Sequence, residues 1–99
     1  MDNVLVTGGT GFLGTRLKMV KPDWTYLSSK DCNLLDFHET LEFFSLNKPS
    51  AVLHLAARVG GIKDNANHQA EYFFQNIMMN TNVVHISSML GIPRVLSSL

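Results

Sequence analysis

The sequence feature that most limits the fold is a glycine-rich loop placed directly between an apolar strand and a helix. Residues 3–7 are apolar and rich in β-branched side chains, which is typical of a buried strand in a parallel sheet. Gly8, Gly11 and Gly14 follow with G-x-x-G-x-x-G spacing. Apolar residues at helical spacing then continue to Val20, where a Lys-Pro-Asp sequence ends the pattern. A strand, a glycine turn and a helix in this order are the context that a dinucleotide-binding loop requires.

Each of the three spaced glycines has a physical role in this interpretation. Gly8 permits a tight turn, Gly11 lets the backbone approach a pyrophosphate, and Gly14 allows the helix to press on the sheet. Free backbone N–H groups and the positive end of the helix would then face the phosphates. A nucleoside-triphosphatase loop is disfavoured because no Lys-Ser or Lys-Thr pair follows the last glycine. A tight turn without any ligand is the alternative.

The rest of the chain alternates further strands and helices. An acidic residue in a capping position, with Glu39 three residues on, predicts a helix that ends at an Asn-Lys-Pro sequence. The last helix is expected over residues 69–90, with a glycine at its end. Strands are expected at Trp24–Leu27, Ala51–Ala57 and Arg94–Leu99. The order βαβαβαβ predicts an α/β fold, a partial Rossmann-type doubly wound parallel sheet truncated at its fourth strand, in spatial order 3-2-1-4.

Length, charge and composition limit the class of protein. The 99 residues fall short of the roughly 150 of a complete doubly wound domain, so we expect residues 1–99 to be the N-terminal part of a Rossmann domain, without a substrate domain. Eight acidic residues balance eight basic ones, which argues against nucleic acid and anionic membranes as partners. One cysteine, no targeting segment and no long apolar run predict a soluble, cytoplasmic chain. The spacing of the four histidines and Cys32 fits no metal site.

The residues after the second expected strand indicate which dinucleotide the chain binds. Two serines and Lys30 stand where an NAD site places a carboxylate, and hydroxyls with a cation suit the 2′-phosphate of NADP. Asp31 could be that carboxylate if the strand runs longer. Asn33 and Leu34 could present a side-chain amide and a backbone N–H to the adenine edge. Asp36 is better explained as the helix cap.

Two later segments carry further candidates. The third expected strand is apolar except for His54, so we expect both of its faces to be covered and His54 to be a core histidine. Ala56 and Ala57 would let a flat cofactor lie across the sheet edge, or would simply allow close packing. In the last helix, Asn76 is expected to pin a neighbouring strand or cofactor loop. That helix also has two apolar rows, and the second is either buried or packed against a partner subunit.

These motifs together resemble the extended short-chain dehydrogenase/reductase superfamily. The glycine loop and the His-Leu-Ala-Ala strand are typical of the whole superfamily. Two further motifs are more similar to the GDP-L-fucose synthase family within it. The segments that carry the resemblance are 7–14, 28–31, 33–36, 54–57, 59–62 and 72–80.

The resemblance implies an activity and a set of cofactor-binding residues. That family epimerises two carbons beside the ketone of GDP-4-keto-6-deoxy-D-mannose and then reduces the ketone with NADPH. It is homodimeric through long helices, which here implies the helix over 69–90, and its substrate is a nucleotide sugar. The residues that would bind NADP by position are Gly8, Gly9, Thr10, Gly11, Phe12, Leu13, Gly14, Lys30, Asn33, Leu34, Leu55, Ala56 and Ala57.

The resemblance also implies what these 99 residues lack. The family's catalytic serine or threonine, tyrosine and lysine follow the fourth strand, so no catalytic residue is assigned here. Tyr26 and Lys30 have the Tyr-x-x-x-Lys spacing but belong to the second strand. We therefore expect a cofactor-binding fragment without turnover. The alternatives are a non-catalytic NADP-binding or dimerising module, or a fragment of another sugar-nucleotide epimerase or dehydratase. The first crossover, over residues 15–23, is shorter than in the family, which should weaken the packing of its helix.

Overall fold

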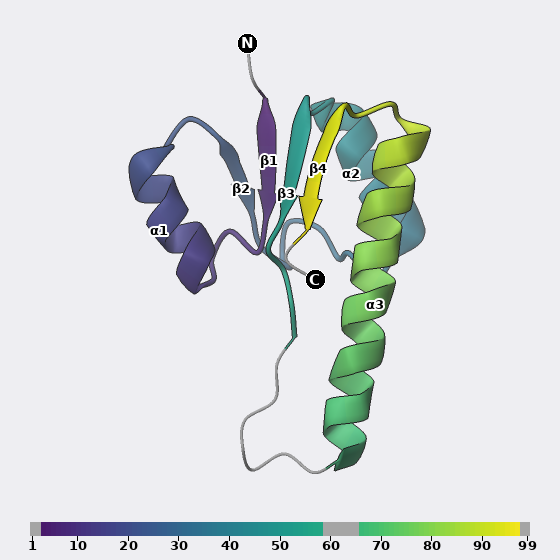
Figure 1. The fold of residues 1–99 in the computed structure, drawn as a ribbon. Coiled ribbons are helices and arrows are strands. Elements are labelled where there is room, and N and C mark those ends of the chain that lie inside the picture. The colour runs from purple at the N-terminus through teal and green to yellow at the C-terminus, as the bar shows by residue number, and fades with distance from the viewer. Residues whose placement is uncertain (1–2, 59–65, 98–99) are drawn as a thin grey trace.

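The computed structural model describes residues 3–58 and 66–97 and has the alternating order of strands and helices that the sequence predicts (Figure 1). All the strands it describes are parallel. The motif at 59–62, most of the loop expected after the third strand, and the last two residues of the chain lie outside the described residues. The elements are β1 (Val4–Thr7), α1 (Phe12–Val20), β2 (Thr25–Leu27), α2 (Phe37–Asn47), β3 (Ala51–His54), α3 (Ala66–Met89) and β4 (Arg94–Ser97).

The strand order of the sheet corrects the sequence prediction. The observed order is β2-β1-β3-β4, so the expected order 3-2-1-4 is wrong. Leu5 of β1 is in register with Thr25 of β2 on one side and Val52 of β3 on the other. The physical reason is that β1 and β3 are the apolar four-residue strands and take the two central positions, whereas the three-residue β2 lies at an edge. The crossover through α2 therefore passes back over β1.

The third strand is shorter and less covered than the sequence predicts. It ends at His54, and the residues up to Ala57 continue beyond the ladder. Val52 and His54 are buried, whereas Ala51 and Leu53 are only half-buried, so the expectation that both faces are covered is wrong. Successive side chains of a strand point to opposite faces, and only one face of β3 lies against packed helices.

The hydrophobic core lies between the sheet and the pair of helices α2 and α3. Leu5 and Val52 from the sheet meet Phe44 of α2 and Val83 and Ile86 of α3, and all five side chains are almost completely buried. Val83 and Ile86 belong to one of the two apolar rows predicted for the last helix. Within the described residues, no helix combines the length and the hydropathy needed to cross a bilayer.

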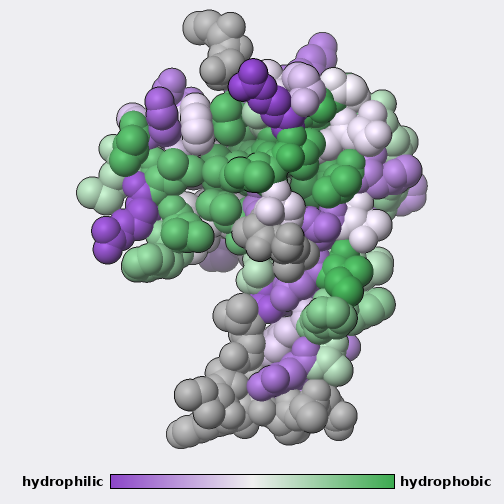
Figure 2. All heavy atoms as spheres, viewed as in Figure 1, coloured by the Kyte–Doolittle hydropathy of each residue, from purple (hydrophilic) through white to green (hydrophobic). Residues whose placement is uncertain are grey.

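The helix α1 lies on the other side of the sheet and is poorly packed (Figure 1). Gly14 is its only buried residue, while Phe12 is 74% exposed and Val20 72% exposed. Figure 2 shows hydrophobic residues gathered across this side of the molecule. The weak packing agrees with the short first crossover noted in the sequence.

Candidate functional site

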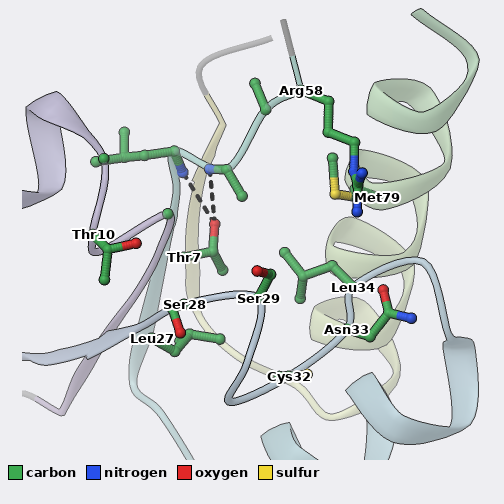
Figure 3. Close-up of a pocket in the computed structure, with 15 residues that line it drawn as sticks. Thr7, Thr10, Leu27, Ser28, Ser29, Cys32, Asn33, Leu34, Arg58 and Met79 are labelled. Atoms are coloured by element: carbon green, nitrogen blue, oxygen red, sulfur yellow. Dashed lines mark hydrogen bonds between the residues drawn. The ribbon is translucent and has the colours of Figure 1, made fainter. Parts of the chain in front are cut away.

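A cavity of about 360 Å³ opens at the carboxyl ends of β1, β2 and β3 (Figure 3). It lies where the chain reverses the direction in which it adds strands, because β2 and β3 flank β1 on opposite sides. Open α/β sheets bind their ligands at such a position. The residues that line it are Thr7, Gly8, Thr10, Gly11, Leu27, Ser28, Ser29, Cys32, Asn33, Leu34, Leu55, Ala56, Ala57, Arg58 and Met79.

The structure divides the predicted cofactor residues into two groups. The first group lines the cavity and consists of Gly8, Thr10, Gly11, Asn33, Leu34, Leu55, Ala56 and Ala57. The second group lies outside the lining and consists of Gly9, Phe12, Leu13, Gly14 and Lys30. The residues of the second group shape the loop or lie at its margin.

The glycine loop is built from close backbone contacts. Gly8 has a φ of 70°, and a Cβ there would lie 2.7 Å from the Ala56 nitrogen. A Cβ on Gly14 would lie 2.5 Å from the Gly8 oxygen, so α1 presses on the loop itself rather than on the sheet. A Cβ on Gly9 would lie 2.7 Å from the Cβ of Tyr26. Glycine at these positions therefore holds the loop tightly between β2 and β3.

The amino end of α1 is suited to an anion. Gly11 is the N-cap, and no side chain caps this end of the helix. The first backbone N–H groups of a helix have no partner inside the helix and carry its positive dipole end. Gly11 also lines the cavity. The uncapped first turn of α1 thus follows directly after a residue that lines the cavity.

A buried pair, Thr7 and His54, fixes the strand ends beneath the cavity. The Thr7 hydroxyl accepts from the backbone N–H groups of Leu55 at 3.1 Å and Ala56 at 3.2 Å. Its own hydrogen is therefore donated to Nδ1 of His54, 2.7 Å away. This places the ring hydrogen on Nε2, and burial lowers the pKa of His54 to about 4. His54 lies in the core, as the sequence predicted, and its lowered pKa makes it neutral there.

The tip of β2 excludes one alternative left open by the sequence. The strand ends at Leu27, and a carboxylate oxygen of Asp31 accepts from the backbone N–H of Ser28 at 2.7 Å and from its hydroxyl at 3.2 Å. Asp31 closes a turn and does not line the cavity. Lys30 is exposed beside this turn, and its backbone N–H donates to the Ser28 hydroxyl at 3.2 Å. Among the described residues, Arg58 is the one charged residue in the lining.

The loop between β2 and α2 forms the opposite wall. Asn33 Oδ1 accepts from the backbone N–H of Leu35 at 3.1 Å. Glu39 accepts from the backbone N–H of Asn33, and not from Asp36 as a reciprocal capping box requires. Asp36 itself caps α2 by accepting from the N–H of Glu39 at 3.0 Å, as predicted. Burial raises the pKa of Cys32, so its thiol stays protonated at the base of this wall.

Two asparagines of α3 hold backbone groups at the cavity. Asn76 accepts from the N–H of Arg58 at 2.6 Å and donates to its carbonyl at 2.8 Å, which confirms the expectation that Asn76 pins a loop. Asn82 donates to the carbonyl of Leu34 at 2.8 Å. Asn82 and Arg58 were not predicted from the sequence, although an amide on the buried face of an apolar helix is a signal for Asn82.

Tyr26 and Lys30 do not form a catalytic pair. The Tyr26 hydroxyl donates to the carbonyl of Lys21 at 2.8 Å. Partial burial and the nearby Asp23 raise its pKa, which is opposite to what a catalytic tyrosine needs. The described residues contain no group of histidine, cysteine and carboxylate side chains arranged for a metal ion.

Known proteins resemble this chain over most of its length. The family model described as NAD dependent epimerase/dehydratase matches residues 4–98. A probable GDP-L-fucose synthase of Drosophila melanogaster is 38% identical and is matched by the whole chain. The GDP-L-fucose synthase of Dictyostelium discoideum is also 38% identical, over 97% of the chain. The chain spans about a third of the length of these relatives, 33% and 32% respectively.

A solved structure agrees with the fold described above. The GDP-L-fucose synthetase of Naegleria fowleri, determined with NADP bound, superposes with a TM-score of 0.77 at 32% sequence identity. The match covers 97% of this chain and 30% of that protein. The likeness therefore extends to the sheet, the glycine loop and the helices around the cavity.

Proposed function

This chain belongs to the NAD dependent epimerase/dehydratase family, and we propose that it forms the NADP-binding part of a GDP-L-fucose synthase-like enzyme. The observation that carries the proposal is the cavity at the switch point of the sheet, with the glycine loop along one side. The activity of such an enzyme is the epimerisation and NADPH-dependent reduction of GDP-4-keto-6-deoxy-D-mannose. The bound cofactor would supply the hydride, and the residues described here would hold and orient it.

The glycine loop would bind the pyrophosphate of the cofactor. The N–H groups of Gly9 and Gly11 are donated to the carbonyls of Leu27 and Gly8, so the phosphates would be bound by the N–H groups of the first turn of α1, where no side chain caps the helix. Such donors bind an anion through fixed dipoles and need no net positive charge. A chain whose formal net charge is zero could therefore still bind a phosphate at this loop.

NADP is favoured over NAD by the side chains at the tip of β2. No carboxylate of the described residues lines the cavity, so nothing there is placed to accept from a ribose 2′-hydroxyl as NAD sites do. Ser28 and Ser29 line the cavity, and Lys30 follows them at its margin. Two hydroxyls and an ammonium group suit a 2′-phosphate. Lys30 would then act from the rim as an exposed point charge.

The other predicted residues divide between the two ends of the cofactor. Asn33 and Leu34 would contact the adenine edge. Leu55, Ala56 and Ala57 would flank the nicotinamide half, because they follow β3 at the same sheet edge. Ala56 is held in place by the Thr7 hydroxyl, which fixes the wall that a flat ring would lie against.

The test is a titration of the purified 99-residue chain with NADPH and with NADH, followed by cofactor fluorescence. We expect tighter binding of NADPH. Lys30→Ala should weaken NADPH binding about tenfold, the usual value of a hydrogen bond to a charged group, and leave NADH unchanged. Lys18→Ala, which removes an exposed lysine of α1, is the matched control. Absence of binding, or a preference for NADH, would refute the proposal.

We also propose that two copies associate through α3, in a cytoplasmic protein. The amino-terminal half of α3 extends beyond the sheet (Figure 1). It carries a group of exposed apolar side chains, of which Phe73 is 67% and Phe74 58% exposed. Exposed apolar clusters of this kind mark interfaces. Sedimentation should show a dimer for the chain and a monomer for Phe74→Lys, and a monomeric wild type would refute this part.

A further inference from the structure

Arg58 is held by α3 at a point where the sheet no longer supports the chain. The ladder of β3 ends at His54, four residues earlier. The Asn76 amide accepts from the Arg58 N–H at 2.6 Å and donates to the Arg58 carbonyl at 2.8 Å. Paired in this way, both backbone groups of Arg58 are satisfied as they would be in a strand ladder. The direction in which the Arg58 side chain leaves the backbone is therefore set by α3.

The same helix, α3, also holds the loop between β2 and α2, which forms the cavity wall opposite Arg58. Asn82 is buried, with 8% of its surface exposed, and donates to the Leu34 carbonyl at 2.8 Å. Asn76 and Asn82 lie six residues apart on α3, a rise of about 9 Å along a rigid helix. One helix thus fixes the backbone of both walls at this end of the cavity, and the opening between them does not depend on either loop alone.

Two apolar side chains, Leu34 and Met79, lie at this end of the cavity with Arg58, and Asn33 is the polar neighbour of Leu34. Leu34 is 5% exposed and Met79 6% exposed, and both line the cavity. Figure 3 shows the Arg58 side chain running beside Met79 towards Leu34, on the side of the cavity away from Thr10 and the glycine loop. Arg58 is therefore placed far from the free N–H groups that suit phosphates.

A planar cation opposite an apolar wall suits a flat aromatic ring. The guanidinium group is planar and weakly hydrated, and it stacks on aromatic faces. A phosphate would be better served by an arginine at the glycine loop, where the other donors are. The base of a dinucleotide has the shape for a slot between Arg58 and Leu34, with Asn33 at its polar edge.

We propose that Arg58, positioned by Asn76, closes the base end of this cavity by stacking its guanidinium group on the purine of the bound dinucleotide. Arg58 is then a binding residue and Asn76 a positioning residue. The inference rests on the proposed function, since it needs a dinucleotide in the cavity. In this proposal α3 determines the distance between the two walls that enclose the purine.

The first test compares Arg58→Ala and Arg58→Lys with the wild-type chain. NADPH affinity is measured directly, and AMP and inorganic pyrophosphate are measured as competitors. Stacking predicts that both variants weaken NADPH and AMP binding about 3- to 30-fold and leave pyrophosphate binding unchanged, because lysine keeps the charge but loses the plane. Arg94→Ala, which removes an exposed arginine of β4, should change nothing. Restored binding in Arg58→Lys, or a loss confined to pyrophosphate, would show an ionic contact with phosphate and overturn the proposal.

The second test separates positioning from general stability. Asn76→Leu should lower AMP affinity as much as Arg58→Ala does, and the double variant should show no further loss. Circular dichroism and the urea midpoint establish that each variant is folded. If Asn76→Leu lowers pyrophosphate binding equally, or if the two losses add, Asn76 does not act through Arg58 and its assignment is wrong.

The two proposals fail in different ways. A wild-type chain that binds neither NADPH nor AMP refutes the proposed function, and this inference with it. A wild-type chain that binds NADPH, together with an Arg58→Ala variant of equal affinity for NADPH and AMP, refutes the stacking role alone.

Discussion

The buried pair of Thr7 and His54 makes the stability of this chain depend on pH. The Thr7 hydroxyl accepts from two backbone N–H groups and so donates to Nδ1 of His54. Because Nδ1 accepts this hydrogen bond, it cannot carry a proton of its own. An imidazolium carries a hydrogen on both nitrogens, so protonation breaks the network. Burial already disfavours the charged ring and lowers the pKa of His54 to about 4.

The magnitude follows from linkage between proton binding and folding. The unfolded chain has the ordinary histidine pKa of 6.5, and the folded chain about 4. Between these values the unfolded state binds more protons, so the stabilisation is fully present above about pH 6.5 and is lost as the pH falls towards about 4. At about pH 5 the loss amounts to about 2 kcal/mol, a large part of the ~5–15 kcal/mol that stabilises a typical domain.

The assay is urea unfolding, followed by circular dichroism at about pH 7.5 and about pH 5. His54→Asn removes the titrating ring and keeps an acceptor for the Thr7 hydroxyl. The unfolding free energy of the wild type should fall by ~2 kcal/mol through His54 between the two pH values, and this fall should be absent in the variant. His38→Asn, at an exposed position on α2, should retain it. If His54→Asn shows the same pH dependence as the wild type, the reasoning about this pair is wrong.

Four further predictions concern other residues. Gly8→Ala should cost more than about 3 kcal/mol and abolish cofactor binding, because its φ is 70° and its Cβ would lie 2.7 Å from the Ala56 nitrogen. Gly91→Ala, with a φ of 68° and open space around it, should cost only about 1–2 kcal/mol, as urea midpoints would show. Asp36→Ala should cost about 1 kcal/mol through the lost cap of α2, and an unchanged midpoint would contradict this. The 99-residue chain should not oxidise NADPH in the presence of the keto-sugar, since Tyr26 is turned to another partner; measurable turnover would contradict this.

Local features of the fold were predictable because they depend on neighbouring residues. The glycine loop, the Asp36 cap and the apolar row through Val83 and Ile86 each show their cause within a few positions. The core position of His54 was also predicted, since it is a lone polar residue in an apolar strand. In each case the physical requirement is met by the chain segment itself.

Long-range features were harder to predict because their causes lie far apart in the sequence. The order β2-β1-β3-β4 depends on which strands are long and apolar enough to occupy the centre, a comparison between segments rather than a property of one. Arg58 was missed because its placement comes from Asn76, 18 residues further on. Asp31 stayed open as an alternative ribose ligand, because only the length of β2 and the turn at Ser28 decide where its carboxylate lies.

The sequence by itself determined that a strand, a tight glycine turn and an uncapped helix end follow one another, because glycine sets the backbone conformation of such a turn locally. Only the tertiary structure decided which segments form the cavity walls opposite that loop. The walls of the cavity come from segments after β2 and β3 that share no local signal, and the side chains of α3 fix both of them. Their spacing is a property of the packed helix and sheet, which no short stretch of sequence contains.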